Sequence, residues 1–197
     1  MPGFAPTTIA TERLRLRFLT TDDAPALYPI FSDRESMLYW SSPAWDEPAQ
    51  AAAHIANALE GYASGNAFSL AITLAATGTV IGVCRLYAFN PQNRRCDIGY
   101  MLSRQHWGKG YMREALAALI SHGFTALDLH RIEADIDPRN RASATLLERL
   151  HFQHEGHLRQ RWIVAGEICD TDFYGLLRSD WVAAANHSPA DNTACPP

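Results

Sequence analysis

The chain has 197 residues, enough for one domain with a substantial hydrophobic core. Hydrophobic residues make up 47% and charged residues 19%, as in ordinary globular proteins, and the formal net charge of −4 argues against nucleic acid as the main partner, since phosphate binding requires a basic surface. No stretch approaches the ~18 consecutive apolar residues of a membrane span and no secretory signal opens the chain, so we expect no membrane partner and a cytoplasmic location.

The first half of the chain predicts two helices between a strand and a hairpin. The segment from Arg13 to Phe18 alternates apolar and polar residues, as a strand with one solvated face does. A short helix follows, and after a Pro- and Ser-rich loop an Ala-rich helix is predicted from Pro48 to Tyr62. The segments from Ala67 to Thr73 and from Val80 to Phe89 flank a Thr77-Gly78 turn and predict a β-hairpin.

The second half alternates strands and helices. A strand is predicted before Ser103, with Cys96, Ile98, Tyr100 and Leu102 on one face. The elements predicted after it are a helix with its apolar stripe from Met112 to Phe124, a strand over Arg131 to Ile136, a helix over Arg141 to Leu150, and strands over Gly156 to Val164 and Cys169 to Leu177. This order predicts a mixed α/β domain over residues 1–182, and we expect a flexible tail over 183–197, which has few residues to bury.

The four cysteines are dispersed and form no C-x-x-C pair, so we expect free thiols in a reducing compartment and neither disulfides nor a zinc site. His151, His154 and His157 recur at intervals of three, a pattern that raises the question of a metal. A usable site needs ligands that converge, and it usually includes a carboxylate or thiolate. We therefore expect no metal.

A glycine-flanked loop is the most informative motif. Gly108 and Gly110 enclose Lys109, the one lysine of the chain, where a strand pattern changes to a helix pattern. Glycine lets the free amides at a helix start approach a ligand, and the helix dipole favours an anion there. Neither the P-loop nor the G-x-G-x-x-G pattern fits this loop. A tight turn without a ligand is the alternative. Lys109 either adds charge near a phosphate or contributes only its N–H.

The loop and four other segments resemble one family. Gln105, Gly108 and Gly110 form Q-x-x-G-x-G, which resembles the acetyl-CoA loop of the GNAT N-acetyltransferases. The segments "TERLRLR", "CDIGYML", "DPRNRASATLLERLHF" and "DTDFYGLLRSDW" resemble the RimJ/RimL branch, and the likeness extends from Thr11 to Trp181. It implies the GNAT fold, with about seven mostly antiparallel strands, one splayed parallel pair and four flanking helices.

The resemblance implies acetyl-CoA as cosubstrate, with no metal. The pyrophosphate would bind main-chain amides of the glycine loop, and the pantetheine arm would lie along the preceding strand, where an amide would polarise the thioester carbonyl. Asn140 would reach the cofactor arm, although it is also a good helix N-cap. The implied cofactor-binding residues are Met101, Leu102, Ser103, Gln105, Trp107, Gly108, Lys109, Gly110, Tyr111, Met112, Asn140 and Ser143.

The implied catalytic groups depart from the wider family pattern. Many relatives carry a tyrosine as general acid seven residues after the asparagine, where this chain has Leu147. Ser143 thereby becomes the first candidate for protonating the thiolate, with water as its competitor. Asp97 and Asp170 are candidates for accepting the amine proton, directly or through water, and solvated carboxylates are the alternative interpretation of both. His151 replaces the usual glycine after the helix, where a left-handed residue is expected to cost about 1 kcal/mol.

The acceptor is the least determined part. By the same resemblance Trp40, Trp45 and Asp172 would line its pocket, although core packing explains the tryptophans equally well. We expect a primary amine, first the N-terminal α-amine of a protein or peptide. The alternatives are a small amine (a polyamine, an aminoglycoside or an amino-acid derivative) and, in another class, a non-catalytic acyl-CoA-binding regulatory protein. A homodimer is expected by analogy.

Overall fold

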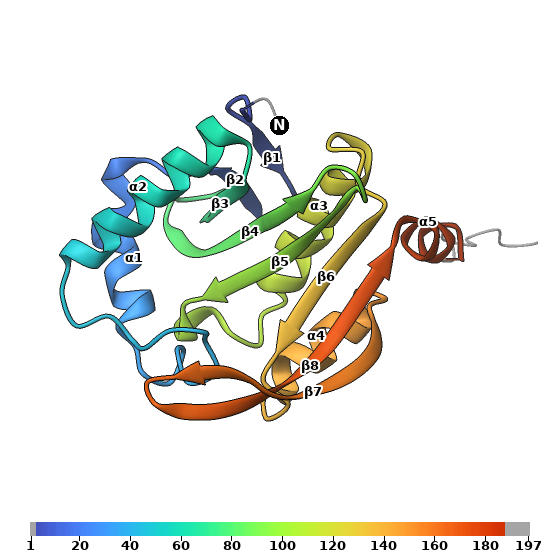
Figure 1. The fold of residues 1–197 in the computed structure, drawn as a ribbon. Coiled ribbons are helices and arrows are strands. Elements are labelled where there is room, and N and C mark those ends of the chain that lie inside the picture. The colour runs from blue at the N-terminus through green and yellow to red at the C-terminus, as the bar shows by residue number, and fades with distance from the viewer. Residues whose placement is uncertain (1–2, 188–197) are drawn as a thin grey trace, which may run out of the picture.

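One twisted sheet organises residues 3–187, which this computed structural model describes (Figure 1). The strands are β1 (Thr8–Ala10), β2 (Leu14–Phe18), β3 (Ala67–Leu74), β4 (Val80–Asn90), β5 (Arg95–Leu102), β6 (Arg131–Ile136), β7 (Gln153–Val164) and β8 (Glu167–Leu177). The helices are α1 (Ala24–Phe31), α2 (Ala49–Ser64), α3 (Tyr111–Thr125), α4 (Arg141–Arg149) and α5 (Arg178–His187), with 3-10 turns η1 (Thr21–Asp23) and η2 (Arg104–His106).

The predicted fold class is confirmed. The sheet order is β1-β2-β3-β4-β5-β6-β8-β7, and every neighbouring pair is antiparallel except β5 and β6. The strand β1 and the helix α5 were not predicted. With three residues β1 is too short to show periodicity, and α5 extends to His187, into the stretch where we expected a tail. The rest of that stretch, residues 188–197, lies outside the described residues.

The parallel pair splays, as the resemblance implied. Pairing between β5 and β6 starts at Arg95 with Arg131 and ends at Asp97 with Glu133. The strand β5 continues to Leu102 and stays paired with β4 on its other side. Beyond Asp97, therefore, the edge of β5 that faces β6 has no strand partner in the described part of the chain, and a gap opens between the two strands.

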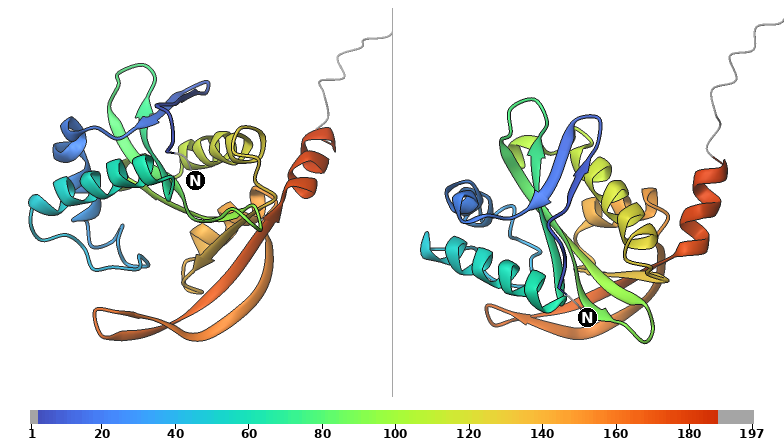
Figure 2. Two further views of the ribbon diagram at one scale, coloured as in Figure 1. Left: turned by 45° about the horizontal axis from the view of Figure 1, so that its top comes forward. Right: turned by 90° about the horizontal axis from the view of Figure 1, so that it is seen from above.

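Each face of the sheet has its own core. Ile98 and Leu102 belong to the larger cluster, which packs under α3 and α4, so the alternation predicted for this strand is confirmed. Met101 and its cross-strand neighbour Val83 belong to a second cluster under α1 and α2. Figure 2 shows the two helix pairs on opposite sides of the sheet. Successive side chains along β4 and β5 therefore point alternately to the α1–α2 face and to the α3–α4 face of the sheet.

The helix α4 is closed at both ends as the sequence predicted. The Asn140 side chain accepts a hydrogen bond from the N–H of Ser143 at 3.0 Å, which caps the N-terminus. His151, just beyond the C-terminus, has φ 68°, the left-handed region that favours glycine. The strain expected at His151 is thus present in the fold.

Two expectations from the sequence concerned free cysteine thiols and membrane-spanning helices. Cys84, Cys96 and Cys169 carry free thiols, and Cys195 lies outside the described residues. Within residues 3–187, no helix is both long enough and apolar enough to cross a membrane.

Candidate active site

The glycine loop presents a row of free backbone amides at the start of α3. Gly108 has φ 71° and Gly110 has φ 77°, so both adopt the left-handed conformation. The N–H groups of residues 108–112 donate to no acceptor within residues 3–187. A Cβ at Gly108 would meet no atom within 4 Å, which leaves this backbone open to a ligand. Amides arranged in this way are the kind of feature that binds anions at helix starts.

Arg13, which directly precedes β2, fixes this loop. The Arg13 guanidinium donates to the Lys109 carbonyl at 3.0 Å and to the Glu114 carboxylate at 2.6 Å. It also lies 4.7 Å from the centre of the Tyr111 ring. The Lys109 side chain is exposed and forms no hydrogen bond or ion pair within residues 3–187, so its backbone is the better-defined part of the site.

The remaining predicted cofactor residues surround the loop. Gln105 is exposed, and Met112 packs partly against the larger core. Trp107 Nε1 donates to the Leu102 carbonyl at 2.8 Å, which fixes the loop to the end of β5. The Ser103 N–H donates to Ile81 on the β4 side at 2.8 Å. Because N–H groups alternate along a strand, that of Leu102 points toward the splayed side.

A cleft of about 280 Å³ opens at the splay. Its walls come from the α1–α2 loop, the middle of β4 and β5, the end of β6, the start of α4, and the β7–β8 hairpin. In Figure 1 the hairpin passes below the open ends of β5 and β6. The cleft thus joins segments that lie far apart in the sequence.

Two hydroxyl groups meet in this cleft. Tyr100 OH on β5 lies 2.7 Å from Ser143 Oγ in the first turn of α4, and both residues line the cleft. Burial raises the pKa of Tyr100 to about 12, so its phenol stays protonated at neutral pH. Leu147, one turn after Ser143, is fully buried and offers no proton. The sequence identified Ser143 but missed Tyr100, which we had assigned only to the core face of its strand.

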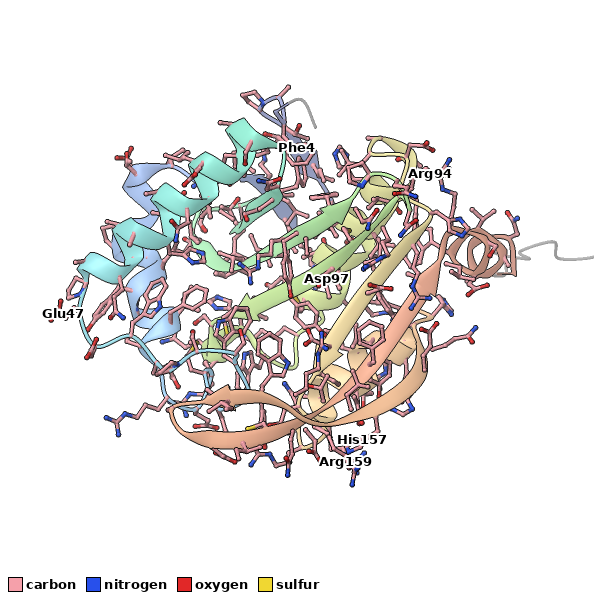
Figure 3. The ribbon with its side chains drawn as sticks, in the orientation of Figure 1. Phe4, Glu47, Arg94, Asp97, His157 and Arg159 are labelled. Atoms are coloured by element: carbon pink, nitrogen blue, oxygen red, sulfur yellow. The ribbon has the colours of Figure 1, made fainter. Side chains whose placement is uncertain are left out.

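Asp97 is an unusual carboxyl group near the splay. Burial, together with the charges of Glu133 and Asp135, raises its pKa to about 6. It lies on the middle of β5, away from His157 on β7 (Figure 3), and is not part of the cleft wall in the described structure. Asp135, which the sequence analysis missed, does line the cleft and accepts a hydrogen bond from Trp162 Nε1 at 2.9 Å.

Asp170 and Asp172 are both engaged by β7. Asp170 lines the cleft, but it accepts the Gln160 N–H at 2.7 Å and lies 3.1 Å from His157 Nε2. The Gln160 N–H and His157 lower the pKa of Asp170, which weakens it as a base. Asp172 lies 2.8 Å from His157 Nδ1 and 3.5 Å from His154 Nε2, and it is not among the described residues of the cleft wall.

The two predicted tryptophans have different surroundings. Trp40 lines the cleft and also meets Phe31 edge-on at 5.8 Å between ring centres. Trp45 stacks on Phe31 at 4.4 Å and packs against the core under α1 and α2, away from the cleft wall. Trp162 on β7 is a cleft residue that sequence reasoning missed. It could have been found only from the pairing of the β7–β8 hairpin.

The structure offers places for acetyl-CoA and, within residues 3–187, no group of three or more histidine, cysteine, aspartate or glutamate side chains that could hold a metal ion. The free amides of residues 108–112 fit a pyrophosphate, and the unpaired edge of β5 fits an extended arm with amide groups of its own. The unpaired edge of β5 includes Tyr100, one member of the hydroxyl pair.

Known proteins with similar sequences and structures identify the family. A family model described as an acetyltransferase (GNAT) domain matches residues 13–153. The uncharacterized N-acetyltransferase p20 of Bacillus licheniformis is 38% identical over 88% of this chain and 98% of its own length. The [ribosomal protein uS5]-alanine N-acetyltransferase of Escherichia coli (strain K12) is 29% identical over 88% of this chain and 92% of its own.

A solved structure, spermidine N-acetyltransferase from Vibrio cholerae in complex with CoA and spermine, matches with a TM-score of 0.77 and 23% identity. The match covers 87% of this chain and 99% of that one, and it supports the fold. The chain belongs to the GNAT acetyltransferase family, among RimJ/RimL-like relatives, and it is an N-acetyltransferase, as its loop and strand motifs predicted.

Proposed function

We propose that this enzyme transfers the acetyl group of acetyl-CoA to the N-terminal α-amine of a protein or peptide, by direct attack in a ternary complex. The observation that carries the proposal is the Tyr100–Ser143 hydroxyl pair, which lines the cleft together with the acceptor walls. The relative that acts on ribosomal protein uS5 supports a protein acceptor.

The cofactor side would work mainly through backbone. The amides of residues 108–112 would bind the pyrophosphate, and the free edge of β5 would pair with the pantetheine arm. Asn140, which lines the cleft, would meet the same arm. Acetyl-CoA supplies an acetyl group activated as a thioester, and the Leu102 N–H would stabilise the negative charge that develops on its carbonyl oxygen.

Ser143 would protonate the departing thiolate, with Tyr100 holding it in the productive orientation. A phenol is a better donor and a poorer acceptor than an aliphatic hydroxyl, so in this proposal Tyr100 would donate to Ser143 Oγ. The Ser143 proton is then free to point into the cleft. Tyr100, which is protonated at neutral pH, would act as a positioning residue through its hydrogen bond with Ser143 Oγ.

Asp97 would accept the amine proton through water, since it is not among the described residues of the cleft wall. A pKa of about 6 keeps Asp97 ionised at neutral pH and makes it a stronger base than an ordinary carboxylate. Asp135, on the cleft wall, contributes to this shift and would attract the ammonium form of the acceptor. Asp170 is less suited because hydrogen bonds already stabilise its charged form.

A small amine is the second candidate acceptor. Asp135 and Asp170 line the cleft and favour a cationic group, and the Vibrio cholerae neighbour is a spermidine N-acetyltransferase. The homodimer and the cytoplasmic location stay predictions.

Mass spectrometry of acetyl transfer tests the proposed function. The wild-type enzyme, acetyl-CoA and a panel of peptides with varied N-terminal residues, polyamines, aminoglycosides and free amino acids would be incubated together. We expect acetylated peptide N-termini. Acetylation of polyamines alone would replace the proposed acceptor, and tight acetyl-CoA binding without any product would favour a non-catalytic acyl-CoA-binding protein.

A further inference from the structure

Arg85 is a cation of the cleft wall that lies on the acceptor side of the sheet. Arg85 on β4 pairs with Gly99 on β5. The pair Val83 and Met101 lies two residues away along each strand and therefore on the same face of the sheet. That face lies under α1 and α2. The guanidinium lies 4.3 Å from the centre of the Tyr87 ring, and a Cβ at Gly99 would come within 3.4 Å of Arg85 Nε. The glycine therefore gives the arginine room to lie across β5 toward the splay.

Arg85 has no carboxylate partner within residues 3–187. No ion pair joins it to an acid, and its buried Nε donates to no acceptor. Arg139, the other arginine of the cleft wall, donates instead to Asp137 at 2.6 Å and to Glu167 at 2.8 Å. A charged group in a half-enclosed wall is stabilised by an opposite charge, so the environment of Arg85 favours binding of an anion.

The neighbouring groups do not neutralise this charge. Burial and the charge of Arg85 lower the pKa of His54 to about 4, so this imidazole is neutral at neutral pH. Burial raises the pKa of Tyr87 to about 12, so its phenol is neutral as well. Asp97 pairs with Tyr87 on the same face, and Asp135 lies nearby on β6, but neither is within ion-pair distance of Arg85.

The phosphates of acetyl-CoA are not the anion that Arg85 would bind. The free amides of the glycine loop precede α3, which packs on the opposite face of the sheet from α1 and α2. Arg85 instead shares its face with the acceptor walls that the α1–α2 loop contributes. The anion must therefore belong to the acceptor.

We propose that the acceptor of this enzyme is an amino-carboxylate, whose carboxylate binds the Arg85 guanidinium while its amine lies toward Asp97 and Asp135. The inference rests on the proposed acetyl transfer and narrows its acceptor. A guanidinium binds a carboxylate through two parallel hydrogen bonds, which gives orientation as well as affinity. The carboxylate could be that of a free amino acid or of an acidic side chain close to a peptide N-terminus.

Matched acceptors that differ only in the carboxylate test this proposal. The rate of acetyl transfer would be measured by mass spectrometry for alanine against alaninamide, and for a peptide beginning Ala-Asp against one beginning Ala-Asn. In the wild type we expect kcat/KM to favour the carboxylate member of at least one pair by about tenfold or more. The pair that shows the preference identifies the source of the carboxylate.

Variants then connect the preference to one side chain. Arg85→Gln is expected to abolish the preference, Arg85→Lys to retain part of it, and Arg139→Gln, the matched control in the same wall, to keep it. Thermal unfolding would verify that each variant is folded. Equal rates for both members of both pairs in the wild type, or an unchanged preference in Arg85→Gln, would overturn the inference while leaving acetyl transfer intact.

A binding measurement distinguishes failure of the carboxylate-binding proposal from failure of the proposed acetyl transfer. N-acetylalanine and its amide would be titrated into the wild-type enzyme and Arg85→Gln, both with CoA bound. Tighter binding of the carboxylate by the wild type alone supports the role of Arg85 even without turnover. Spermidine as the best acceptor of the wild type would overturn it, because Arg85 would repel a polycation.

Discussion

The region that we assign to acetyl-CoA, the glycine loop and the free edge of β5, is built mainly from backbone, whereas the acceptor side is built from side chains. On the cofactor side, two left-handed glycines and the free amides of residues 108–112 form a site within one short segment. On the acceptor side, Trp40, Arg85, Asp135 and Trp162 come from four separate elements. The first side depends on conformation, and the second depends on which side chains the fold brings together.

This difference predicts how the two sides tolerate change. Any side chain that permits the loop conformation leaves the amides in place, so cofactor binding depends on a few positions. Acceptor choice can change with single substitutions that leave the fold and the cofactor site intact. Relatives with the same fold can therefore act on different amines, as the ribosomal-protein and spermidine acetyltransferases do.

The largest effect on catalysis is expected at Ser143, between the cofactor region and the acceptor side. Ser143→Ala removes the proton donor for the thiolate, and we expect kcat to fall about 100-fold. The KM for acetyl-CoA should change little, because the amides that bind the cofactor remain. Steady-state kinetics with the best peptide acceptor measures both values. A kcat within threefold of the wild type would assign the protonation to water.

Tyr100→Phe is expected to lower kcat about tenfold, since Ser143 loses the donor that orients it. The informative result is the double variant. If Tyr100 acts only through Ser143, adding Tyr100→Phe to Ser143→Ala should cause no further loss of kcat. Additive losses, accompanied by a lower Tm in both backgrounds, would show that Tyr100 serves packing instead.

Asp97→Asn tests the proposed base through the pH profile. The wild-type kcat/KM should fall as the pH is lowered through about 6, because the protonated carboxyl no longer accepts a proton. The variant should be about tenfold slower at pH 7.5 and should lose this acidic limb. If the limb persists in Asp97→Asn, another group is the base.

The same carboxyl links folding to pH with a defined sign. Its pKa rises from 3.8 to about 6 on folding, so its stabilising contribution is complete below pH 3.8 and is lost as the pH rises through 6. The free energy of unfolding of Asp97→Asn, compared with that of the wild type at the same pH, should therefore be higher at pH 8 than at pH 4. We expect a difference of about 1 kcal/mol, because the half-exposed group is partly screened. Urea titrations at both pH values measure it.

The smallest expected effect lies outside both sides of the cleft. His151→Gly should raise the free energy of unfolding by up to about 1 kcal/mol, since glycine adopts φ 68° without a Cβ penalty. His151→Ala is the matched control, because it also removes the imidazole ring and keeps the Cβ. Neither variant should change kcat, and equal stabilities of the two variants would contradict the strain at this position.

The sequence predicted what depends on local patterns. The alternation of β5 and the role of glycine on both sides of Lys109 follow from residues close in the chain, whereas the left-handed His151 was expected from comparison with the family pattern. The splay was expected only through the family resemblance. Sequence reasoning missed Tyr100 as the partner of Ser143, because 43 residues separate them and only the fold joins β5 to α4.

The acceptor side was missed for the same physical reason. The sequence did not indicate Arg85 as a binding residue. Its proposed role depends on Gly99 across the hairpin and on the lack of an ion-pair partner within residues 3–187. For Trp45 the acceptor pocket and core packing were left as equal alternatives, and it stacks on Phe31 away from the cleft wall. A tryptophan in a loop does not reveal from sequence which of two neighbouring apolar surroundings it enters.

Calorimetric titration of acetyl-CoA into the wild type, Gly108→Val and Lys109→Ala tests most directly whether backbone holds the cofactor. Valine is strongly disfavoured at φ 71°, so Gly108→Val should displace the amides and weaken binding at least about 30-fold. Lys109→Ala keeps the backbone and should bind within about twofold of the wild type, since an exposed charge contributes little. The opposite result, with Gly108→Val unchanged and Lys109→Ala strongly weakened, would contradict the account.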